Sequence, residues 1–449
     1  MNKTLATICI LGLTAGSCTQ KKTSATESTE QQQTELTMLV GTYTTGESKG
    51  IYSYRFNQET GESQALSLAE IGNPSYLIPS SDGKFVYAVS EFGEDRAAVN
   101  AFAFDRTKGT FRFLNSQKTL GADPCYLLTD GKHVVTANYS GGSISIFSIA
   151  KDGTLLPVDS VIAFKGNGAD KVRQEKPHLH CVQISPEGNY LFANDLGTDQ
   201  IHKFSIHPAA NKNDLICQND QNELNNENSL ENQHKQKELN DQNSQKGLKD
   251  QKNLEVQKDL DNEKNMDDQK VQKELNDQKR AFIQKGSTAA FKLKPGSGPR
   301  HLTFSPNGHF AYIINELSGT VVAFSYNEGD LKEIQTIAAD TVGGRGSADI
   351  HISPDGKFLY ASNRLKADGI AIFSIDPASG QLTKAGYQLT GINPRNFIIT
   401  PNGKYLLVAC RDSNSIQVYK RDLSTGLLTN MNQDIKLDKP VCIKFIGNE

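Results

Sequence analysis

The sequence predicts an all-β fold, a seven-bladed β-propeller closed by strands from both ends of the chain. Three observations predict it: a turn-and-strand pattern recurs at intervals near 48 residues, the strands alternate apolar and polar residues, and the last segment resembles the start of the repeat. A repeat of this length indicates a propeller rather than a sandwich. The chain contains no tryptophan, which excludes the WD40 class.

The N-terminal segment has the order of a bacterial export signal. Lys3 gives a basic start, residues 5–13 are an apolar run too short to span a bilayer, and small residues lead to Cys18. We expect residues 1–17 to be a lipoprotein signal peptide and Cys18 to be the lipidated residue. An ordinary signal peptide with an incidental cysteine is the alternative. Residues 18–35 are polar and predict a flexible tether, so we expect export and lipid anchoring to the cell envelope, on the periplasmic or outer-membrane face.

Each repeat begins its second strand after a tight turn. A Gly preceded by Asp, Asn or Glu supplies the positive φ that such a turn requires. A further alternating strand follows, as at residues 143–147 and 415–419, with the period of two that half-buried strands show. The turn glycines are Gly83, Gly131, Gly188, Gly308, Gly356 and Gly403.

One interval between turn glycines is far longer than the rest. The spacings are 48, 57, 120, 48 and 47 residues. Residues 211–280 contain no aromatic residue and no proline, and Gln, Asn, Lys, Asp and Glu predominate. We interpret residues 211–285 as an insertion in a blade loop, disordered or loosely helical, because its leucines keep no steady heptad.

The remaining propeller region, residues 36–449, accommodates seven repeats once the insertion is set aside. Six contain the turn glycine, and the seventh is split. Residues 39–43 and 50–54 supply its later strands, and residues 439–445 resemble the repeat start at residues 298–304. One blade therefore takes strands from both ends, which closes the ring and covers its edges.

Composition argues against several classes of function. A net charge of -3 offers no basic surface for nucleic acid. No Cys/His group has the spacing of a zinc site, so neither a metal nor a cofactor is predicted. Five further cysteines show no CxxC spacing and are expected to be small core residues rather than disulfides: Cys125, Cys181, Cys217, Cys410 and Cys442.

Polar residues interrupt the apolar repeat at two recurring places, where the side chains of a propeller converge on its central channel. The repeat starts carry Cys125, His178, His180, Arg300, His301, Asp349, His351 and Arg395. The ends of the following strands carry Asn138, Asp195, Glu316, Asn363, Arg364 and Arg411. For His351 a structural role in the core is favoured, and for Arg300 and Arg395 the alternative to function is a bridge between blades.

Six segments carry a resemblance to a known family: residues 176–180, 195–199, 298–302, 315–317, 352–356 and 362–364. Together they resemble the lactonase family of seven-bladed propellers, which includes bacterial 6-phosphogluconolactonase and the fungal carboxy-muconate lactonising enzyme. The resemblance runs from about Met38 to the C-terminus, apart from the insertion. It implies a catalytic set of His180, Arg300, Glu316 and Arg364; we expect His178, His301, Asn363 and Arg395 to bind substrate.

These residue types suit the hydrolysis of a lactone. Arginine polarises the carbonyl as negative charge develops, and a second arginine binds a phosphate or carboxylate. Glu316 and His180 are the candidates for proton transfer. The chain lacks a Ser-His-Asp order and a nucleophile elbow, so covalent catalysis is not predicted.

We therefore expect a lactonase that hydrolyses a sugar lactone of the 6-phosphogluconolactone or gluconolactone type. The alternatives are a non-catalytic ligand-binding or scaffolding lipoprotein and a muconate-type lactonising enzyme. Export favours an unphosphorylated lactone, because a phosphorylated sugar lactone is a cytoplasmic metabolite. The expected partner is a small-molecule lactone, with membrane contact through the lipid alone, and the expected state is a monomer.

Overall fold

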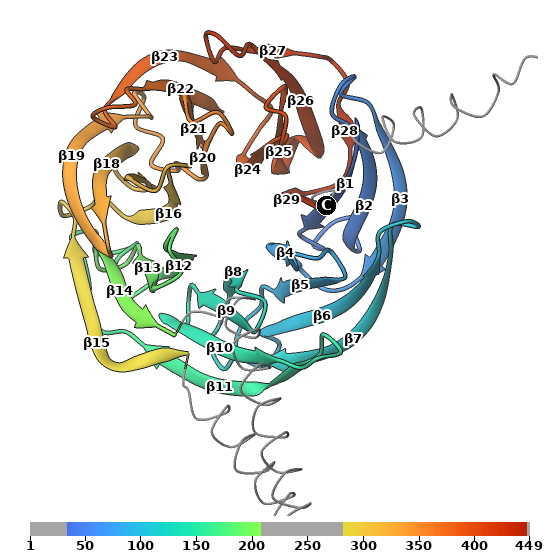
Figure 1. Cartoon of the computed structure of the whole chain (residues 1–449), viewed down its shortest axis with the longest axis horizontal. Helices are drawn as coiled ribbons and strands as arrows, with labels where there is room; N and C mark the ends of the chain where they lie inside the picture. Colours follow the sequence, from blue (N-terminus) through green and yellow to red (C-terminus); the bar gives the residue numbers. More distant parts are fainter. Residues whose placement is uncertain (1–33, 208–281, 447–449) are drawn as a thin grey trace, which may run out of the picture.

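A computed structural model describes residues 34–207 and 282–446. Their strands form seven antiparallel sheets that stand in a ring (Figure 1), which confirms the predicted seven-bladed propeller. The predicted signal peptide, Cys18, Cys217 and most of the tether and insertion lie outside the described residues. No helix in the described part of the chain is long and apolar enough to cross a membrane.

The strands of each blade lie side by side, with one strand at the centre of the ring and the last at its rim. Blade 1 contains, from the centre outwards, β29 (Pro440–Ile446), β1 (Glu35–Thr42), β2 (Gly50–Asn57) and β3 (Ser63–Glu70). Blade 2 contains β4 (Leu77–Pro79), β5 (Phe85–Ser90), β6 (Ala98–Asp105) and β7 (Thr110–Lys118). Blade 3 contains β8 (Pro124–Thr129), β9 (His133–Asn138), β10 (Ser143–Ile149) and β11 (Leu155–Ala163).

The other four blades follow the same order. Blade 4 contains β12 (Leu179–Ile184), β13 (Tyr190–Asp195), β14 (Gln200–Ile206) and β15 (Ile283–Lys292). Blade 5 contains β16 (Pro299–Phe304), β17 (Phe310–Asn315), β18 (Thr320–Asn327) and β19 (Asp330–Ala338). Blade 6 contains β20 (Ile350–Ile352), β21 (Phe358–Asn363), β22 (Gly369–Ile375) and β23 (Leu382–Leu389). Blade 7 contains β24 (Pro394–Ile399), β25 (Tyr405–Cys410), the 3-10 helix η1 (Arg411–Ser413), β26 (Ser415–Arg421), β27 (Leu428–Asn430) and β28 (Ile435–Lys436).

Blade 1 closes the ring as predicted, because its innermost strand comes from the C-terminal end. β29 pairs antiparallel with β1, and Val40 lies opposite Ile443. Both side chains are fully buried. Gly41 lies where β1 approaches blade 2; a Cβ there would stand 2.2 Å from the carbonyl oxygen of Pro74, so no larger residue fits without a backbone shift.

The recurring turn is held by its own side chains. In blade 6, the Ser353 hydroxyl accepts the N–H of Phe358 at 3.0 Å, and Asp355 accepts the N–H of Lys357 at 3.2 Å. Gly356 supplies a φ of 71° between them. Blade 5 repeats the pattern in its own turn, where Phe310 donates to the Ser305 hydroxyl.

Neighbouring blades are joined by apolar packing and by buried tyrosines. Tyr312 of blade 5 packs with Phe373 of blade 6 in one core cluster. Its hydroxyl donates to the Gly380 carbonyl at 2.9 Å, and Tyr360 of blade 6 donates to Gly426 of blade 7 at 2.8 Å. Each such bond contributes about 1 kcal/mol beyond the burial of the ring.

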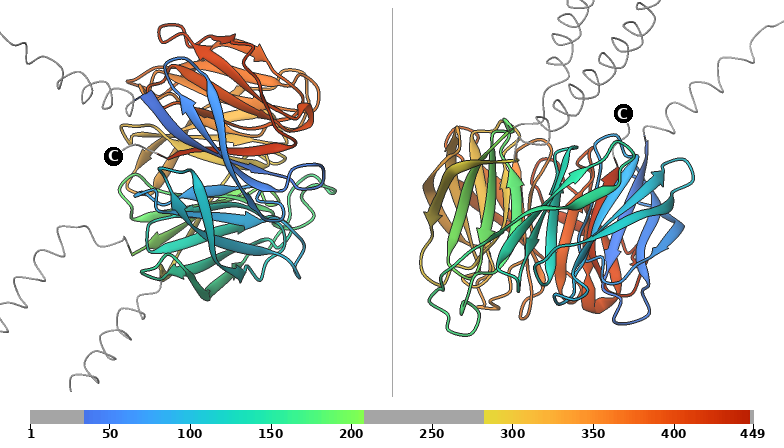
Figure 2. Two further views of the ribbon diagram at one scale, coloured as in Figure 1. Left: turned by 90° about the vertical axis from the view of Figure 1, so that its right-hand side faces the viewer. Right: turned by 90° about the horizontal axis from the view of Figure 1, so that it is seen from below.

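Successive strands are antiparallel, so the innermost strands begin where the second strands end. We call this end of the ring the mouth and the other end the base; Figure 2 shows the ring from the side. Four strand ends lie at the base: the starts of β1 and β15 and the ends of β14 and β29. β15 starts at Ile283, so residues 283–285 belong to blade 4 rather than to the predicted insertion, and Glu35 belongs to β1 rather than to the tether.

The cysteines in the described part of the chain lie in the core. Cys125, Cys181, Cys410 and Cys442 are all buried free thiols. Cys125 and Cys181 belong to innermost strands, and Cys410 ends β25. These four thiols behave as the small core residues that their scattered spacing indicates.

Candidate active site at the mouth of the propeller

A carboxylate surrounded by three arginines lies at the mouth. Glu316 is the first residue after β17, and its N–H donates to the Gly298 carbonyl just before β16. Arg300 Nε donates to Glu316 Oε2 at 3.0 Å, and Arg364 Nη2 lies 3.3 Å from the same oxygen. Arg173 Nη2 donates to Oε1 at 2.7 Å.

The three arginines reach Glu316 from different elements, and they differ in exposure. Arg300 belongs to β16, Arg364 follows β21 of the next blade, and Arg173 belongs to the loop between β11 and β12. Arg300 is 1% exposed and Glu316 is 6% exposed. The Arg173 side chain is 38% exposed, so it is the arginine that borders the solvent.

His180 completes this group, which we call the Glu316 cluster: His180, Arg173, Arg300, Glu316 and Arg364. The imidazole belongs to β12, and its Nε2 lies 3.9 Å from Glu316 Oε2. Its Nδ1 lies 3.6 Å from the Cys125 sulfur. The structure therefore brings together all four residues of the expected catalytic set, while their individual roles stay predictions.

Charge in the Glu316 cluster is unbalanced in favour of the cations. Three guanidinium groups and one carboxylate leave two net positive charges. Burial by itself raises the pKa of the Glu316 carboxyl, but Arg364, Arg300 and Arg173 outweigh it and lower this pKa to about 2. Glu316 is therefore ionised at neutral pH and is a very weak base, which argues against the general-base role considered for it.

His180 differs from Glu316 because it is uncharged at neutral pH. Burial and the charges of Arg300, His301 and Arg395 hold the pKa of its imidazole well below the usual value. The ring is therefore neutral at neutral pH and keeps one nitrogen as an acceptor. Of the two candidates for the base, His180 is the one whose charge state fits.

His301 lies one residue beyond Arg300 and adjoins the Glu316 cluster, with its ring 5.5 Å from the ring of His180. Its Nδ1 is 2.7 Å from Asp349 Oδ1, and its Nε2 is 3.1 Å from Arg300 Nη1. Arg300 can only donate, so Nε2 accepts and Nδ1 donates to Asp349. Both ring nitrogens of His301 are thus used within the protein, and its expected role as a substrate ligand stays a prediction. His351 also binds Asp349, at 3.0 Å, which fits the structural role expected for it.

Two further residues expected to bind substrate are used within the protein. His178 Nδ1 lies 3.1 Å from the Tyr139 carbonyl oxygen, and its ring stacks on that tyrosine. Asn363 accepts the Ser347 hydroxyl at 2.6 Å and donates to the Ala339 carbonyl at 3.0 Å. The Nε2 of His178 lies 3.3 Å from Glu175, so His178 and Asn363 are both held by contacts within the protein, and their expected role in binding substrate stays a prediction.

Arg395, the remaining expected ligand, belongs to a second charged group at the mouth. Its Nη2 lies 3.6 Å from Glu91 Oε2, and its guanidinium lies 5.3 Å from the centre of the Tyr43 ring. Tyr43 donates to Glu91 with 3.0 Å to each carboxylate oxygen. We call Tyr43, Ser75, Glu91 and Arg395 the Glu91 cluster; the N–H groups of Ser75 and Glu91 both donate to the Asn73 carbonyl oxygen.

Sequence comparison of the repeats missed Arg173, Glu91 and Tyr43. The loop that holds Arg173 runs from the end of β11 at Ala163 to the start of β12 at Leu179 and is longer than the loops that join the other blades, so the repeat gave no equivalent position for it. Glu91 and Tyr43, by contrast, are each the first residue after a second strand, as Glu316 is. A search of that one position in every blade would have found both.

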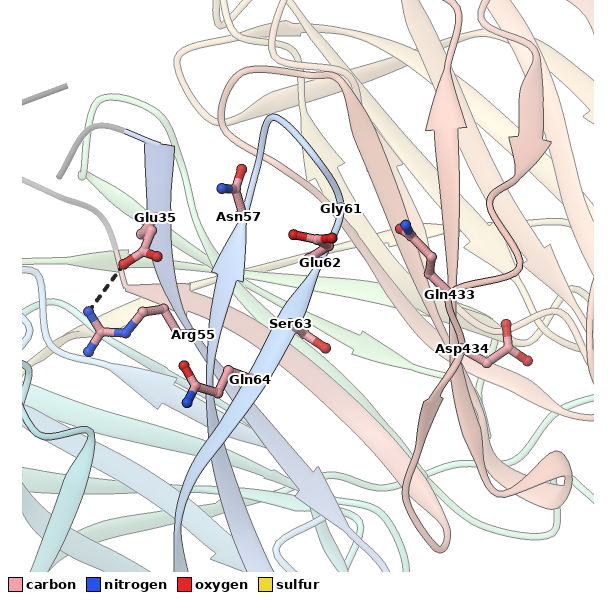
Figure 3. A pocket seen from close by; sticks show the side chains of 9 residues that line it. All are labelled: Glu35, Arg55, Asn57, Gly61, Glu62, Ser63, Gln64, Gln433 and Asp434. Atoms are coloured by element: carbon pink, nitrogen blue, oxygen red, sulfur yellow. Dashed lines mark hydrogen bonds and ion pairs between the residues drawn. The ribbon is translucent and has the colours of Figure 1, made fainter. Parts of the chain in front are cut away.

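A separate pocket of about 620 Å³ lies on the rim, where blade 1 meets blade 7 (Figure 3). It contains none of the predicted site residues. Arg55 and Glu35 form an ion pair at 3.2 Å in its wall. Its lining is completed by Asn57, Gly61, Glu62, Ser63, Gln64, Gln433 and Asp434.

Comparison with known proteins places this geometry in context. The chain matches the family described as "Lactonase, 7-bladed beta-propeller" over residues 37–228 and 268–445. A 6-phosphogluconolactonase of Formosa agariphila is 35% identical, and the match covers 89% of this chain and 96% of the relative.

Two solved structures share the whole ring. A protein of Bacteroides fragilis, provisionally named a 6-phosphogluconolactonase, is 58% identical with a TM-score of 0.76, covering 92% of this chain and 98% of its own. A periplasmic gluconolactonase of Pseudomonas aeruginosa is 28% identical with a TM-score of 0.71, covering 92% of this chain and 99% of its own.

Proposed function

Because this chain belongs to the lactonase family of seven-bladed β-propellers, we propose that it hydrolyses a sugar lactone to the sugar acid at the Glu316 cluster. The observation that carries the proposal is the meeting of a neutral histidine with three arginines on one buried carboxylate. This arrangement offers a base and a concentration of positive charge at one point. Lactone hydrolysis needs both.

The arginines stabilise the charge that develops on the carbonyl oxygen. When water attacks the carbonyl carbon, its oxygen becomes an oxyanion, and the excess positive charge around Glu316 favours that state. Arg300 and Arg364 are buried and held by Glu316, so their donors are oriented before substrate arrives. Arg173 is partly exposed and can move aside to admit the lactone.

His180 moves the proton. Its unprotonated nitrogen takes a proton from the attacking water as the new C–O bond forms, and the imidazolium returns that proton to the ring oxygen as the lactone C–O bond breaks. The product is the open hydroxy acid. Glu316 remains ionised throughout and holds the arginines in place.

We propose that the substrate is an unphosphorylated lactone of the gluconolactone type. The predicted export signal supports this choice, because a phosphorylated sugar lactone is made in the cytoplasm. The Pseudomonas aeruginosa relative named a periplasmic gluconolactonase supports it as well. The phosphorylated lactone named for other relatives is the alternative, and the excess positive charge at the mouth accommodates it.

We also propose that the protein is exported and anchored through a lipid on Cys18. The chain enters the propeller at Glu35, where β1 begins at the base. An anchor attached before β1 is therefore joined to the base, and the mouth is at the other end of the ring. Substrate then reaches the Glu316 cluster from the side opposite the attachment.

The direct test is a hydrolysis assay on the purified chain without residues 1–17. Acid release from glucono-δ-lactone and from 6-phosphoglucono-δ-lactone is followed in a pH-stat, with spontaneous opening subtracted. We expect turnover of the unphosphorylated lactone that is lost in Arg364→Ala, while Arg55→Ala on the rim retains it. A folded protein that accelerates neither lactone would favour the non-catalytic ligand-binding alternative.

A further inference from the structure

Glu91 holds in blade 2 the place that Glu316 holds in blade 5. Each is the first residue after the second strand of its blade. The N–H of Glu91 donates to the Asn73 carbonyl at 3.0 Å, and the N–H of Glu316 donates to the Gly298 carbonyl at 2.7 Å. The same backbone hydrogen bond therefore places both carboxylates at the mouth.

The partners of Glu91 come from two other blades. Tyr43 follows β1 of blade 1, and Arg395 lies in β24 of blade 7. Burial raises the pKa of the Tyr43 phenol well above its usual value, so the hydroxyl is protonated and donates to Glu91. With one arginine and one carboxylate, the Glu91 cluster has no net charge.

Ser75 adds an unused polar group. It lies two residues after Asn73, as Arg300 lies two residues after Gly298, so it occupies the arginine's position in its own blade. Ser75 is 2% exposed, and its hydroxyl oxygen has no hydrogen-bond partner among the described residues. A buried hydroxyl without a partner is unfavourable, and a ligand hydroxyl would satisfy it.

The two clusters border the same part of the channel. Cys125 lies 3.6 Å from His180 Nδ1. Next to Cys125, Tyr126 stacks on Tyr76, the neighbour of Ser75, with 4.1 Å between the ring centres. Both tyrosines also contact the ring of His301, which lies 5.5 Å from the His180 ring. These ring contacts link the Glu91 cluster to the Glu316 cluster.

We propose that Tyr43, Ser75, Glu91 and Arg395 form a subsite for neighbouring hydroxyl groups of the lactone, and that this subsite selects polyhydroxylated over unsubstituted lactones. The proposal rests on the hydrolase function and adds the substrate class to it. A carboxylate accepts from two adjacent hydroxyls, while tyrosine and arginine donate to their oxygens. A neutral cluster of this kind suits a polyol rather than a phosphate.

The test compares glucono-δ-lactone with δ-valerolactone, which has the same ring without hydroxyls. Polar groups of a binding site that lose their hydrogen-bonding partners produce strong discrimination, so the wild-type ratio of kcat/KM should favour gluconolactone. We expect Glu91→Gln and Tyr43→Phe to lower that ratio about tenfold or more, mainly through KM. Glu94→Gln, an exposed change on the same loop, should keep the wild-type ratio.

Calorimetric binding of D-gluconate separates this inference from the hydrolase proposal. If wild type hydrolyses neither lactone but binds gluconate at least tenfold more tightly than Glu91→Gln, the subsite stands and the hydrolase proposal fails. Equal losses on both lactones, or gluconate binding by Glu91→Gln as tight as by wild type, would overturn the subsite. Thermal melts identify misfolded variants, and Ser75→Ala provides a milder change with the same expected direction.

Discussion

Glu316 and Glu91 occupy equivalent positions three blades apart, yet the protein surrounds them differently. Glu316 contacts three arginines within 3.3 Å, whereas Glu91 has one arginine at 3.6 Å and a tyrosine. The repeat fixes where each carboxylate stands. Its neighbours fix the local charge. For Glu316 these are Arg300 of the same blade, Arg364 of the next blade and Arg173 of a loop, whereas for Glu91 they come from blades 1 and 7.

The comparison indicates a division of labour across the mouth. The Glu316 cluster carries two net positive charges and favours an oxyanion, so its residues should affect kcat. The Glu91 cluster is neutral and rich in hydrogen-bonding groups, so its residues should affect KM. Substitutions in the two clusters can therefore separate chemistry from recognition.

The largest effect is expected from the two equivalent arginines. Arg300→Ala removes a buried donor to the developing oxyanion and should lower kcat about 10³-fold. Arg395→Ala should act mainly on KM, by about tenfold, because it removes binding to hydroxyls. Steady-state kinetics on glucono-δ-lactone measure both, with Arg55→Ala as the matched surface control. A larger fall in kcat for Arg395→Ala than for Arg300→Ala would reverse the assignment.

The next largest effect is expected on the free energy of unfolding, which substitutions of the two glutamates should lower by different amounts. Glu316→Gln leaves buried guanidinium charges without a counter-ion and should cost about 3 kcal/mol of unfolding free energy, against about 1 kcal/mol for Glu91→Gln. Urea unfolding at pH 7 measures both.

The pH dependence of this difference has a defined sign. The Glu316 pKa is lowered from 4.5 to about 2, so its contribution is present above pH 4.5 and is lost as the pH falls towards 2. The unfolding free energies of Glu316→Gln and Glu91→Gln should therefore become similar in acid. A constant difference down to pH 3 would contradict this electrostatic account.

His180→Ala should lower kcat about 10²-fold, the usual scale for the loss of a general base. Because its pKa lies well below 6.5, the wild-type rate above the spontaneous background should be flat from pH 6 to 8. The rate should fall only when the pH drops through that lowered pKa, since protonation removes the base. An inflection close to pH 6.5 would show that the imidazole is not shielded in this way.

The smallest effect is expected from the ion pair between Asp170 and Arg345, which joins the loop of Arg173 to the loop before β20. The Arg345 side chain is 58% exposed, so the pair contributes less than about 1 kcal/mol. Asp170→Asn should change KM by about twofold at most. A change above tenfold would mean that the pair controls access to Arg173.

The sequence predicted the ring well because the ring is periodic. Turn glycines such as Gly356 and alternating strands repeat, and the split blade was visible in the likeness of residues 439–445 to a repeat start. The same alignment of the repeats predicted that four residues meet at one end of the ring: His180, Arg300, Glu316 and Arg364.

The charges and the directions of the side chains do not repeat from blade to blade, so the sequence did not predict which side chains contact one another at the site. Arg173 lies in the long loop between β11 and β12, and only the fold shows that it reaches Glu316. Asn363 and Arg364 are adjacent in sequence, yet the first binds within its blade and the second turns to Glu316. The lowered pKa of Glu316 depends on three arginines acting together, which no single motif displays.

The way the ring closes also means that its strand order does not depend on where the chain starts. Thr37 at the start of β1 pairs with Ile446 at the end of β29, so a short linker can join these ends. His207 and Phe282 are already connected by a backbone hydrogen bond of 3.0 Å. A circular permutant that begins at Phe282 and ends at His207 would keep every strand pair and make blade 4 the split blade.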